Sequence, residues 1–259
     1  MIKRPDILLI DADTPAYTAC QSSEVEVEHG DWHMVASNFP QACRRFQETI
    51  ELWQKHFQCD TIELFFTGRN NFRKTVDPEY KGHRQKRKPL GFYRLVKLAL
   101  EQYPSQLVEG LEADDLLGMR CHQTEMNIVL ISADKDLRQI QCRQWNGTEE
   151  VTPTLEECDR FFFQQILTGD AVDGYKGCPG IGAVKAKALL DKTPRELWWE
   201  AVVNAFVKAG LTEADALQNA QLARILRPGE YDWKAHTPIL WTPSGLNCPP
   251  PCIWKRTTG

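Results

Sequence analysis

Three short apolar runs, each long enough for one buried strand, constrain the fold of this chain more than any other feature. They lie at residues 6–10, 62–66 and 127–131, and a polar residue follows each of them. Between the first two runs, residues 37–57 carry apolar side chains every three or four positions, which is typical of an amphipathic helix. Strands that alternate with helices predict an α/β fold with a mostly parallel central sheet and helices on both faces.

The remaining pattern divides the chain into a core and a helical part. Residues 24–28 and 32–35 flank a turn and predict a hairpin. A capping box with proline at residues 193–196 predicts the start of a helix that Gly210 ends. Other helices are expected at 92–102, from 112 onward, and at 161–167, 183–190 and 212–226. We therefore predict an α/β core over 1–150, a helical subdomain over 151–228 and an irregular segment over 229–259.

Composition places the chain among ordinary globular proteins. Its 259 residues are 42% hydrophobic and 25% charged, which is too apolar for a disordered protein. No apolar run approaches the roughly 20 residues that a membrane helix needs, so no membrane partner is expected. Nine scattered cysteines suit a reducing compartment, and we predict a cytoplasmic protein. Cys248 and Cys252 have no second Cys/His pair nearby and are not expected to bind zinc.

Positive and negative charges are segregated along the chain. The net charge of −4 by itself argues against nonspecific binding to nucleic acid. A dense run of Lys and Arg nevertheless extends over residues 69–88, while acidic groups cluster elsewhere. Separate blocks of opposite sign fit a site where metal ions bind the acids and a polyanion binds the bases.

The acidic residues that stand out form groups at element boundaries. A single acid at a helix start is commonly a complement to the helix dipole, so the prediction depends on the groups together. Carboxylates that share a site repel one another, and hard divalent cations such as Mg²⁺ or Mn²⁺ relieve that repulsion. Because Asp11 and Asp134 follow strand ends, distant acids are expected to meet at one edge of the sheet. The groups are Asp11 with Asp13; Glu112, Asp114 and Asp115; Asp134 with Asp136; and Asp170 with Asp173.

A glycine-rich turn before the predicted helix at 183–190 is a candidate phosphate site. Glycines let a phosphate approach the backbone, and the helix that follows presents free N–H groups. A plain turn between two helices is the alternative explanation. The candidate DNA-binding residues are Gly177, Gly180, Ile181, Gly182, Lys185 and Lys187.

The basic motif at residues 78–84 is a candidate for binding a single strand. Bases would stack on an exposed Tyr80, and phosphates would meet Lys81 and Arg84. A solvated charged loop is the alternative explanation for a basic run taken alone. Further cations for the same strand are Lys86, Arg87 and Lys88.

Taken together, these motifs resemble the 5′-nuclease superfamily. That superfamily comprises the flap endonucleases, the 5′-nuclease domain of bacterial DNA polymerase I and the phage 5′→3′ exonucleases, and the phage enzymes look most similar. The motifs follow in the family's order and near its spacing. They are Ile-Asp-Ala-Asp at 10–13, Tyr-Lys-Gly-His-Arg at 80–84, Glu-Ala-Asp-Asp at 112–115, Asp-Lys-Asp at 134–136, and Gly-Asp-Ala-Val-Asp at 169–173 before Pro-Gly-Ile-Gly at 179–182.

The resemblance implies a PIN-like α/β core, a helical arch at about 72–95 and a helix-hairpin-helix DNA-binding element. It implies metal-dependent cleavage of DNA from 5′ ends by a monomer, with flaps, nicks and RNA–DNA hybrids as further substrates. Lys81 and Arg84 would neutralise the scissile phosphate, and K⁺ would bind at the glycine turn. Two Mg²⁺ or Mn²⁺ ions would bind, one at Asp11, Glu112, Asp114 and Asp115, the other at Asp134, Asp136, Asp170 and Asp173.

The chain departs from the family pattern at one place. Many relatives carry an aspartate just past the second strand, but residues 65–72 contain no acid. Asp13 would either replace that acid or support the turn in which it lies.

Two other functions remain open from the sequence. Asp11 and Asp13 also resemble the nucleophile and acid/base of haloacid-dehalogenase-type phosphatases. That reading leaves Glu112 without a role, and Asp170 and Asp173 stand three apart where that family has four. The other alternative is a PIN-like protein that binds nucleic acid without cleaving it.

Overall fold

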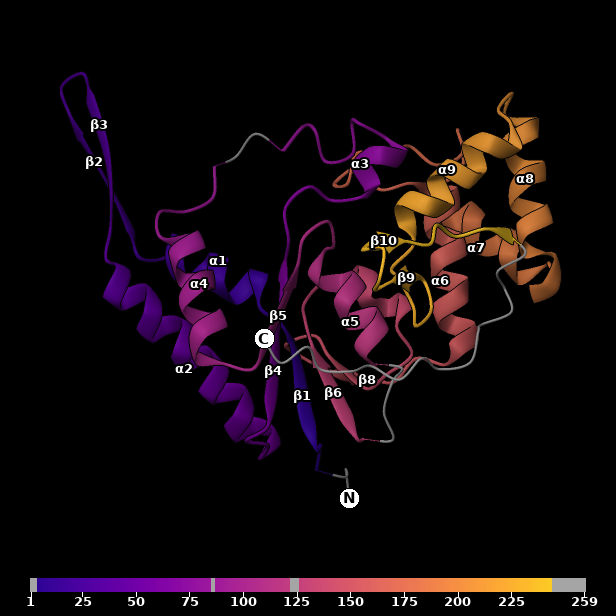
Figure 1. Cartoon of the computed structure of the whole chain (residues 1–259). Coiled ribbons are helices and arrows are strands. Elements are labelled where there is room, and N and C mark those ends of the chain that lie inside the picture. Colours follow the sequence, from indigo (N-terminus) through magenta and orange to yellow (C-terminus); the bar gives the residue numbers. More distant parts are fainter. Residues whose placement is uncertain (1–3, 85–86, 122–125, 244–259) are drawn as a thin grey trace.

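The computed structural model describes residues 4–84, 87–121 and 126–243. Its centre is a six-stranded sheet with the order β5-β4-β1-β6-β7-β8 (Figure 1). All neighbouring strands run parallel except β8, which is antiparallel to β7. The mostly parallel α/β sheet predicted from the sequence is confirmed. The strands are β1 (Ile7–Asp11), β4 (Ile62–Thr67), β5 (Ser105–Val108), β6 (Ile128–Ile131), β7 (Gln144–Trp145) and β8 (Glu150–Val151).

Helices cover both faces of this sheet, as expected for strands that are apolar on both sides. Side chains alternate along β1, so Leu8 and Ile10 join the core on one face while Ile7 and Leu9 join the core on the other. The second core includes α5 (Ala113–Cys121), which lies on the opposite side of the sheet in Figure 1. The first core is closed by α1 (Asp13–Gln21), α2 (Phe39–Phe57) and α4 (Phe92–Gln102).

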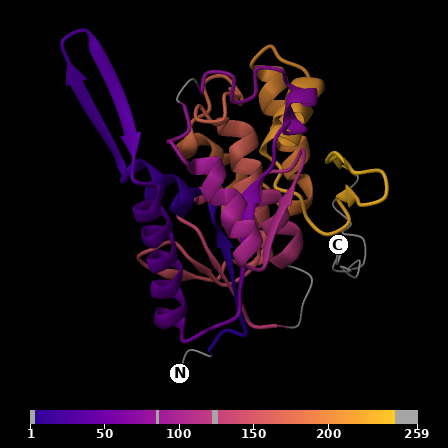
Figure 2. The same cartoon turned by 60° about the vertical axis from the view of Figure 1, so that its left-hand side comes forward.

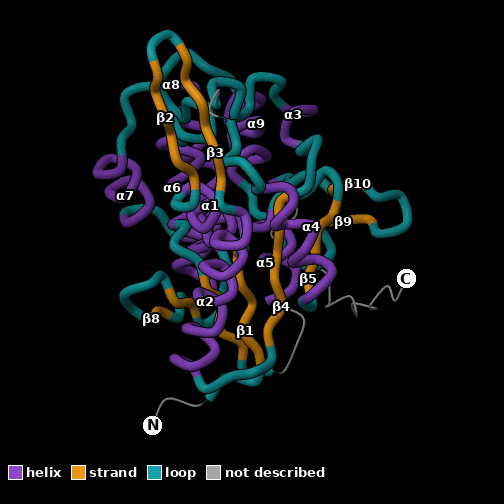
Figure 3. Tube along the Cα trace, turned by 90° about the vertical axis from the view of Figure 1, so that its left-hand side faces the viewer, coloured by secondary structure: helices purple, strands orange, loops and turns teal. Residues whose placement is uncertain are grey.

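A two-stranded hairpin projects away from the sheet. It consists of β2 (Glu24–His29) and β3 (Trp32–Ser37), paired antiparallel where the sequence predicts a hairpin. Figures 2 and 3 show that it extends well beyond the helices at its base. The base is held by Glu24, whose carboxylate pairs with Arg87 at 2.7 Å.

The later part of the chain forms a helical cluster with an apolar core of its own. That core includes Phe162, Phe163, Trp198 and Phe206, all fully buried. The short strands β9 (Tyr231–Asp232) and β10 (Thr237–Pro238) follow it. A separate core fits the predicted helical subdomain, whose limits at 151 and 228 stay a prediction. The helices are α6 (Leu155–Thr168), α7 (Ala183–Asp191), α8 (Trp198–Lys208) and α9 (Glu213–Ala223).

The expected helix start at residues 193–196 is wrong. The Thr193 hydroxyl donates to the carbonyl of Leu189 (2.8 Å) and does not cap a helix. A short 3-10 turn, η2 (Arg195–Leu197), precedes α8 instead. Capping boxes do open α6 and α9, where Thr154 pairs with Glu157 and Thr212 with Asp215.

The segment from 72 to 95 contains less helix than expected. Among its described residues, only α3 (Arg73–Val76) and the start of α4 are α-helical. Lys86 lies outside the described residues, as do Cys248 and Cys252. Within the described ranges, no helix is long and apolar enough to span a bilayer.

Candidate active site

A polar cleft of about 370 Å³ opens where β1 and β6 end. We call it the acidic cleft, and it brings together groups as distant in the sequence as Asp11 and Asp173, as parallel strands with a shared carboxyl edge allow. Its carboxylates are Asp11, Asp13, Glu112, Asp114, Asp134, Asp136, Asp170 and Asp173. The same cleft contains the cations Lys81, Arg84, Lys88 and Lys135.

Asp11 and Asp114 form the least neutralised part of the cleft. Asp11 ends β1 and accepts a hydrogen bond from the Ser132 hydroxyl (2.8 Å). Burial and the neighbouring charge of Asp13 raise the pKa of Asp11 to about 7. Burial, together with Asp11 and Asp134, raises the pKa of Asp114 well above its usual range. Two buried carboxyls whose pKa values are raised by burial and by neighbouring carboxylates favour a cation between them.

Glu112 is, in contrast, strongly neutralised. Its carboxylate accepts a short hydrogen bond from the Lys81 ammonium and a bond of 3.1 Å from the Tyr80 hydroxyl. Burial acts to raise the pKa of Glu112, but Lys81 and Arg73 outweigh it and lower that pKa to about 2. Burial likewise acts against the charge of Lys81, yet Glu112 and Asp173 raise the pKa of Lys81 above its usual range. Both groups are therefore charged near neutral pH.

The structure places Asp115 outside the acidic cleft, which contradicts its prediction as a metal ligand. Its fully buried carboxylate forms a bidentate ion pair with Arg73, with both contacts at 2.8 Å. The same carboxylate accepts the backbone N–H of Glu112 (3.1 Å), as an acid in the first helical turn commonly does. Glu112 precedes helix α5, and Asp114 in the first turn of that helix lines the cleft.

Tyr80 is also placed differently from the prediction. It is only 2% exposed and belongs to the apolar core of the helical cluster. Its hydroxyl donates to Glu112 (3.1 Å) and Asp173 (2.8 Å), which fixes the ring beneath the carboxylates. A ring held in this way is not an exposed platform for a base, so the proposed stacking on Tyr80 is wrong.

Asp136 and Asp170 gather around Lys135, and Asp134 lies just before it in the chain. The Lys135 ammonium lies 3.0 Å from Asp136 and 2.7 Å from Asp170. Asp134 caps the 3-10 turn η1 (Lys135–Gln139) by accepting the backbone N–H of Asp136 (2.8 Å). Lys135 is not among the site residues predicted from the sequence, although the Asp-Lys-Asp motif contains it.

The basic motif reaches the cleft from the segment after α3. The backbone N–H of Lys81 donates to the carbonyl of Asp173 (2.8 Å), and Arg84 pairs with the Asp173 carboxylate at 2.9 Å. Lys81 has a left-handed backbone with φ +55°. Lys88 lines the cleft with its ammonium 4.5 Å from the centre of the Phe92 ring, whereas Arg87 turns away to Glu24.

Thr67 ends β4, at the start of the stretch where the expected acid is absent. Its backbone N–H donates to the Asp13 carboxylate (3.1 Å), and its hydroxyl accepts the N–H of Ala113 (3.1 Å). Asp13 thus supports the turn after β4 and also lines the acidic cleft. Both proposed roles of Asp13 are compatible with this position.

The glycine turn lies directly before α7, with Gly182 at the N-cap of that helix. Gly180 and Gly182 are exposed, and a Cβ added to either would meet no atom within 4 Å. Gly177 is buried instead, and its added Cβ would lie 2.2 Å from the Gly169 nitrogen. Ile181 packs on the helical core. Of the two lysines, Lys185 donates to the carbonyl of Gly180 (2.8 Å) and Lys187 pairs with Asp191 (2.6 Å).

Comparisons with known proteins agree with this geometry. A family profile described as the 5′–3′ exonuclease, N-terminal resolvase-like domain, matches residues 6–160. The exonuclease of Escherichia phage T7 is 28% identical over 281 residues, covering 92% of this chain and 93% of that protein. The exodeoxyribonuclease of Enterobacteria phage T3 matches with the same identity and coverage.

Solved structures share the fold. The phage T5 D15 protein, crystallised with metal ions, has a TM-score of 0.62 at 16% identity and covers 84% of this chain and 88% of its own. A T5 5′-exonuclease with bound zinc has a TM-score of 0.61 at 18% identity and the same coverage. The resemblance drawn from the motifs is confirmed, since the family profile spans more than half of the sequence. The chain therefore belongs to the 5′–3′ exonuclease family.

Proposed function

We propose that this protein is a metal-dependent 5′→3′ exodeoxyribonuclease that hydrolyses DNA phosphodiester bonds from 5′ ends during DNA replication or degradation. One observation carries the proposal. Carboxylates from distant segments line a single cleft that also contains Lys81 and Arg84. Acids suited to divalent cations therefore lie beside cations suited to a phosphate.

The donor set fits two divalent ions. Asp11 and Asp114 have raised pKa values because burial and mutual repulsion disfavour their charged forms. Among the described residues, no three acids already converge at metal-ligand spacing, and an added cation would offset the repulsion between the carboxylates. All-oxygen donors favour Mg²⁺ or Mn²⁺.

We assign the first ion to Asp11, Glu112 and Asp114, without Asp115, whose carboxylate is committed to Arg73. The second ion is assigned to the cleft carboxylates that follow β6 and α6. When bound, the two ions would stabilise the attacking and leaving oxygens of the phosphodiester. The second set is Asp134, Asp136, Asp170 and Asp173.

Lys81 and Arg84 are assigned to the scissile phosphate. Both already lie within the cleft and contact Asp173, at 3.5 Å and 2.9 Å respectively. A phosphate that becomes more negative in the transition state gains more from these cations there than in the ground state. The Tyr80 hydroxyl contacts the carboxylates of both Glu112 and Asp173, so Tyr80 acts as a positioning residue.

The exposed turn at Gly180 and Gly182 is assigned to the duplex backbone. It leaves room for a phosphate at the N-terminus of α7. The Lys185 ammonium on the Gly180 carbonyl supports the idea that a cation suits this turn, and K⁺ is the proposed ligand of the same carbonyl. Lys88, Lys185 and Lys187 would add phosphate contacts.

Flaps, nicks and RNA–DNA hybrids are the proposed further substrates, on a protein that acts as a monomer. A T5 flap endonuclease complex with DNA and metal ions shares the fold, with a TM-score of 0.57. The phage relatives support a site of action in the cytoplasm of an infected or bacterial cell.

A single assay tests the proposal. A duplex labelled at its 5′ end is incubated with the protein in Mg²⁺ and in EDTA, beside p-nitrophenyl phosphate under both conditions. We expect short labelled products from the duplex with Mg²⁺ only, and no p-nitrophenol. Binding without cleavage would favour the non-catalytic alternative, and p-nitrophenol release would favour the phosphatase.

A further inference from the structure

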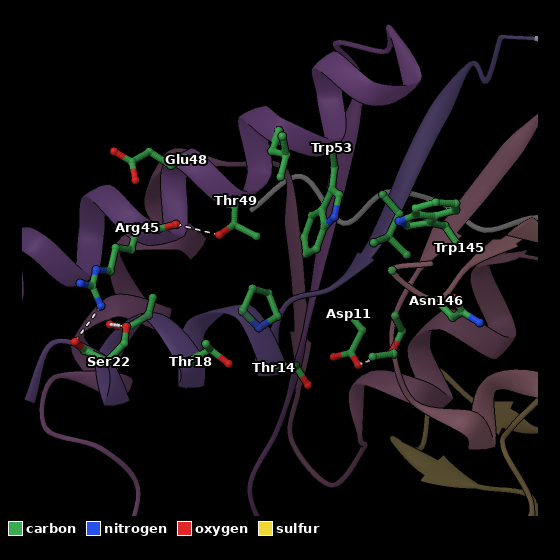
Figure 4. Close-up of a pocket in the computed structure, with 17 residues that line it drawn as sticks. Asp11, Thr14, Thr18, Ser22, Arg45, Glu48, Thr49, Trp53, Trp145 and Asn146 are labelled. Carbon is green, nitrogen blue, oxygen red and sulfur yellow. Dashed lines mark hydrogen bonds between the residues drawn. The ribbon is translucent and has the colours of Figure 1, made fainter. Parts of the chain in front are cut away.

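A second cavity lies directly beside the acidic cleft and shares Asp11 with it. It has a volume of about 510 Å³ and opens between α1, α2 and the ends of β6 and β7 (Figure 4). We call it the indole pocket, because Trp53 from α2 and Trp145 from β7 both line it. The proposed function gives this pocket no role.

The walls of the indole pocket are mostly apolar, with Pro15 and Ile131 beside the two indoles. Trp145 is held by ring contacts to His56 and Phe57, with centroids 4.9 Å and 5.8 Å away. Figure 4 shows the Trp53 side chain extending from α2 toward the residues below it, Asp11 among them. A concave, preformed and aromatic site of this volume suits a small planar ligand.

The charges at the pocket favour a base and sugar over a phosphate group. Arg45 is the cation among its lining residues, and it already donates to the backbone carbonyl of Ser22 at 2.7 Å. Glu48 lies one helical turn further along α2 and also lines the pocket, which disfavours an anion. A nucleobase, in contrast, gains from stacking on an indole without any need for a countercharge.

The position of the pocket identifies which nucleotide would enter it. The inference rests on the proposed function, in which the turn before α7 holds the duplex and the acidic cleft holds the scissile phosphate. The helical cluster and the helices α1 and α2 lie on opposite sides of the sheet in Figure 1. A 5′→3′ exonuclease releases the nucleotides on the 5′ side of the cut, so that side of the strand faces the indole pocket.

We propose that the indole pocket binds the 5′-terminal nucleoside of the strand being degraded, with its base stacked on Trp53. A terminal nucleoside seated there places the first phosphodiester bond over Asp11. The pocket thereby favours removal of nucleotides from an end over cleavage inside a strand.

A binding experiment in EDTA tests this without catalysis. A duplex carries 2-aminopurine either at the 5′ terminus or at an interior position, and its fluorescence is followed as protein is added. Stacking on an indole quenches the terminal probe, and Trp53→Ala restores its fluorescence while Trp53→Phe does not. Trp32→Ala, at an exposed position on the hairpin, is the matched control and leaves the quenching unchanged. Equal behaviour of the terminal and interior probes overturns the proposal.

A cleavage experiment in Mg²⁺ gives a second measurement that does not depend on a variant. Substrates with an intact or an abasic 5′-terminal nucleotide are compared by single-turnover kinetics at subsaturating protein. We expect the wild-type protein to lose roughly fivefold or more in kcat/KM with the abasic end, the effect of one stacked base. Trp53→Ala removes this difference, and Trp32→Ala retains it.

The two failures are distinguishable. Wild-type protein that cleaves both substrates equally contradicts the indole pocket proposal and leaves the proposed exonuclease function intact. Wild-type protein that cleaves neither substrate in Mg²⁺ contradicts the proposed function itself. A Trp53→Ala preparation that fails to fold is recognised by its circular dichroism, and the wild-type comparison then decides.

Discussion

Arg73 and Asp115 form a buried, bidentate ion pair that joins the segment after β4 to the start of α5, with both N–O distances at 2.8 Å. Arg73 also donates to the backbone carbonyls of Leu222 and Arg224, just where the helical cluster meets the sheet domain. The Arg73 guanidinium thus connects α3, the start of α5 and the segment at the end of α9. Because the pair is fully desolvated, each partner depends on the other.

We predict that Asp115→Ala lowers the free energy of unfolding by about 3–5 kcal/mol, because it leaves Arg73 charged and buried without its partner. Urea denaturation monitored by circular dichroism measures this change. The neighbouring Asp114→Ala is the matched control. It removes a carboxylate whose pKa burial and repulsion raise, so it should weaken Mg²⁺ binding with little loss of stability. Similar stability for both variants would contradict the structural role of Asp115.

A second prediction concerns the acids that follow β6. Asp134→Asn combined with Asp136→Asn should abolish cleavage and preserve DNA binding. Asparagine retains a side-chain oxygen to accept the Asp136 N–H and Gln165 amide bonds, both 2.8 Å, but it removes negative charge from the cleft. Band-shift and cleavage assays on one preparation check both expectations. Cleavage at the wild-type rate would contradict the assignment of Asp134 and Asp136 to the active site.

Lys81→Ala should slow single-turnover cleavage at saturating protein by at least tenfold, toward the roughly 10²–10³ that one transition-state donor contributes. The affinity for DNA should change little, because several other cations are proposed to contact the DNA backbone. Alanine is as chiral as lysine, so the left-handed backbone at φ +55° is no more strained in the variant. Lys88→Ala is the comparison and should mainly weaken binding. If both variants lose only affinity, Lys81 is one member of a solvated basic surface.

These residues also show how far the sequence predicts the site. The apolar runs fix the strands, and parallel strands bring their carboxyl ends together, so the gathering of Asp11, Asp134 and Asp136 follows from local patterns. The buried orientation of the Asp115 side chain does not follow from local patterns, because its partner Arg73 is 42 residues away in the chain. No periodicity links the two positions.

Tyr80 illustrates the same limit. An aromatic residue within a basic run favours exposure and base stacking when only neighbours in the sequence are considered. Its hydroxyl instead finds Asp173, 93 residues further along the chain, and its ring enters the core of the helical cluster. Burial of this kind depends on tertiary packing. The same is true of the start of α8 at Trp198, which lies later than the predicted start at 193–196.

Salt dependence tests how the protein holds a duplex. The logarithm of the binding constant should fall with the logarithm of salt concentration by roughly 0.9 for each phosphate neutralised. Lys185→Ala, at the start of α7, should reduce that slope by about one. Lys192→Ala, at the other end of the same helix, should leave the slope unchanged. Fluorescence anisotropy of a labelled duplex measures all three slopes. The KCl concentration is varied from roughly 50 to 300 mM, the range in which salt screens such charge contacts.

Asp11 makes the metal-free protein sensitive to pH. Its pKa is about 7 in the folded chain against an ordinary value of 3.8. Between these values the folded protein binds a proton that the unfolded chain has released, so the free energy of unfolding falls as pH rises through this window. We therefore expect the Tm in EDTA to decrease from pH 5 to pH 7.5 through this group.

Divalent ions should oppose that trend, because Mg²⁺ and the proton compete for the Asp11 carboxylate. The rise in Tm on adding Mg²⁺ should accordingly be larger at pH 7.5 than at pH 5. Thermal unfolding followed by circular dichroism, with Mg²⁺ and with EDTA at each pH, measures both effects. Asp11→Asn removes the titrating group and should flatten the pH dependence in EDTA. An unchanged slope in that variant would assign the pH dependence to other carboxyls of the acidic cleft, Asp114 first among them because burial and repulsion raise its pKa too.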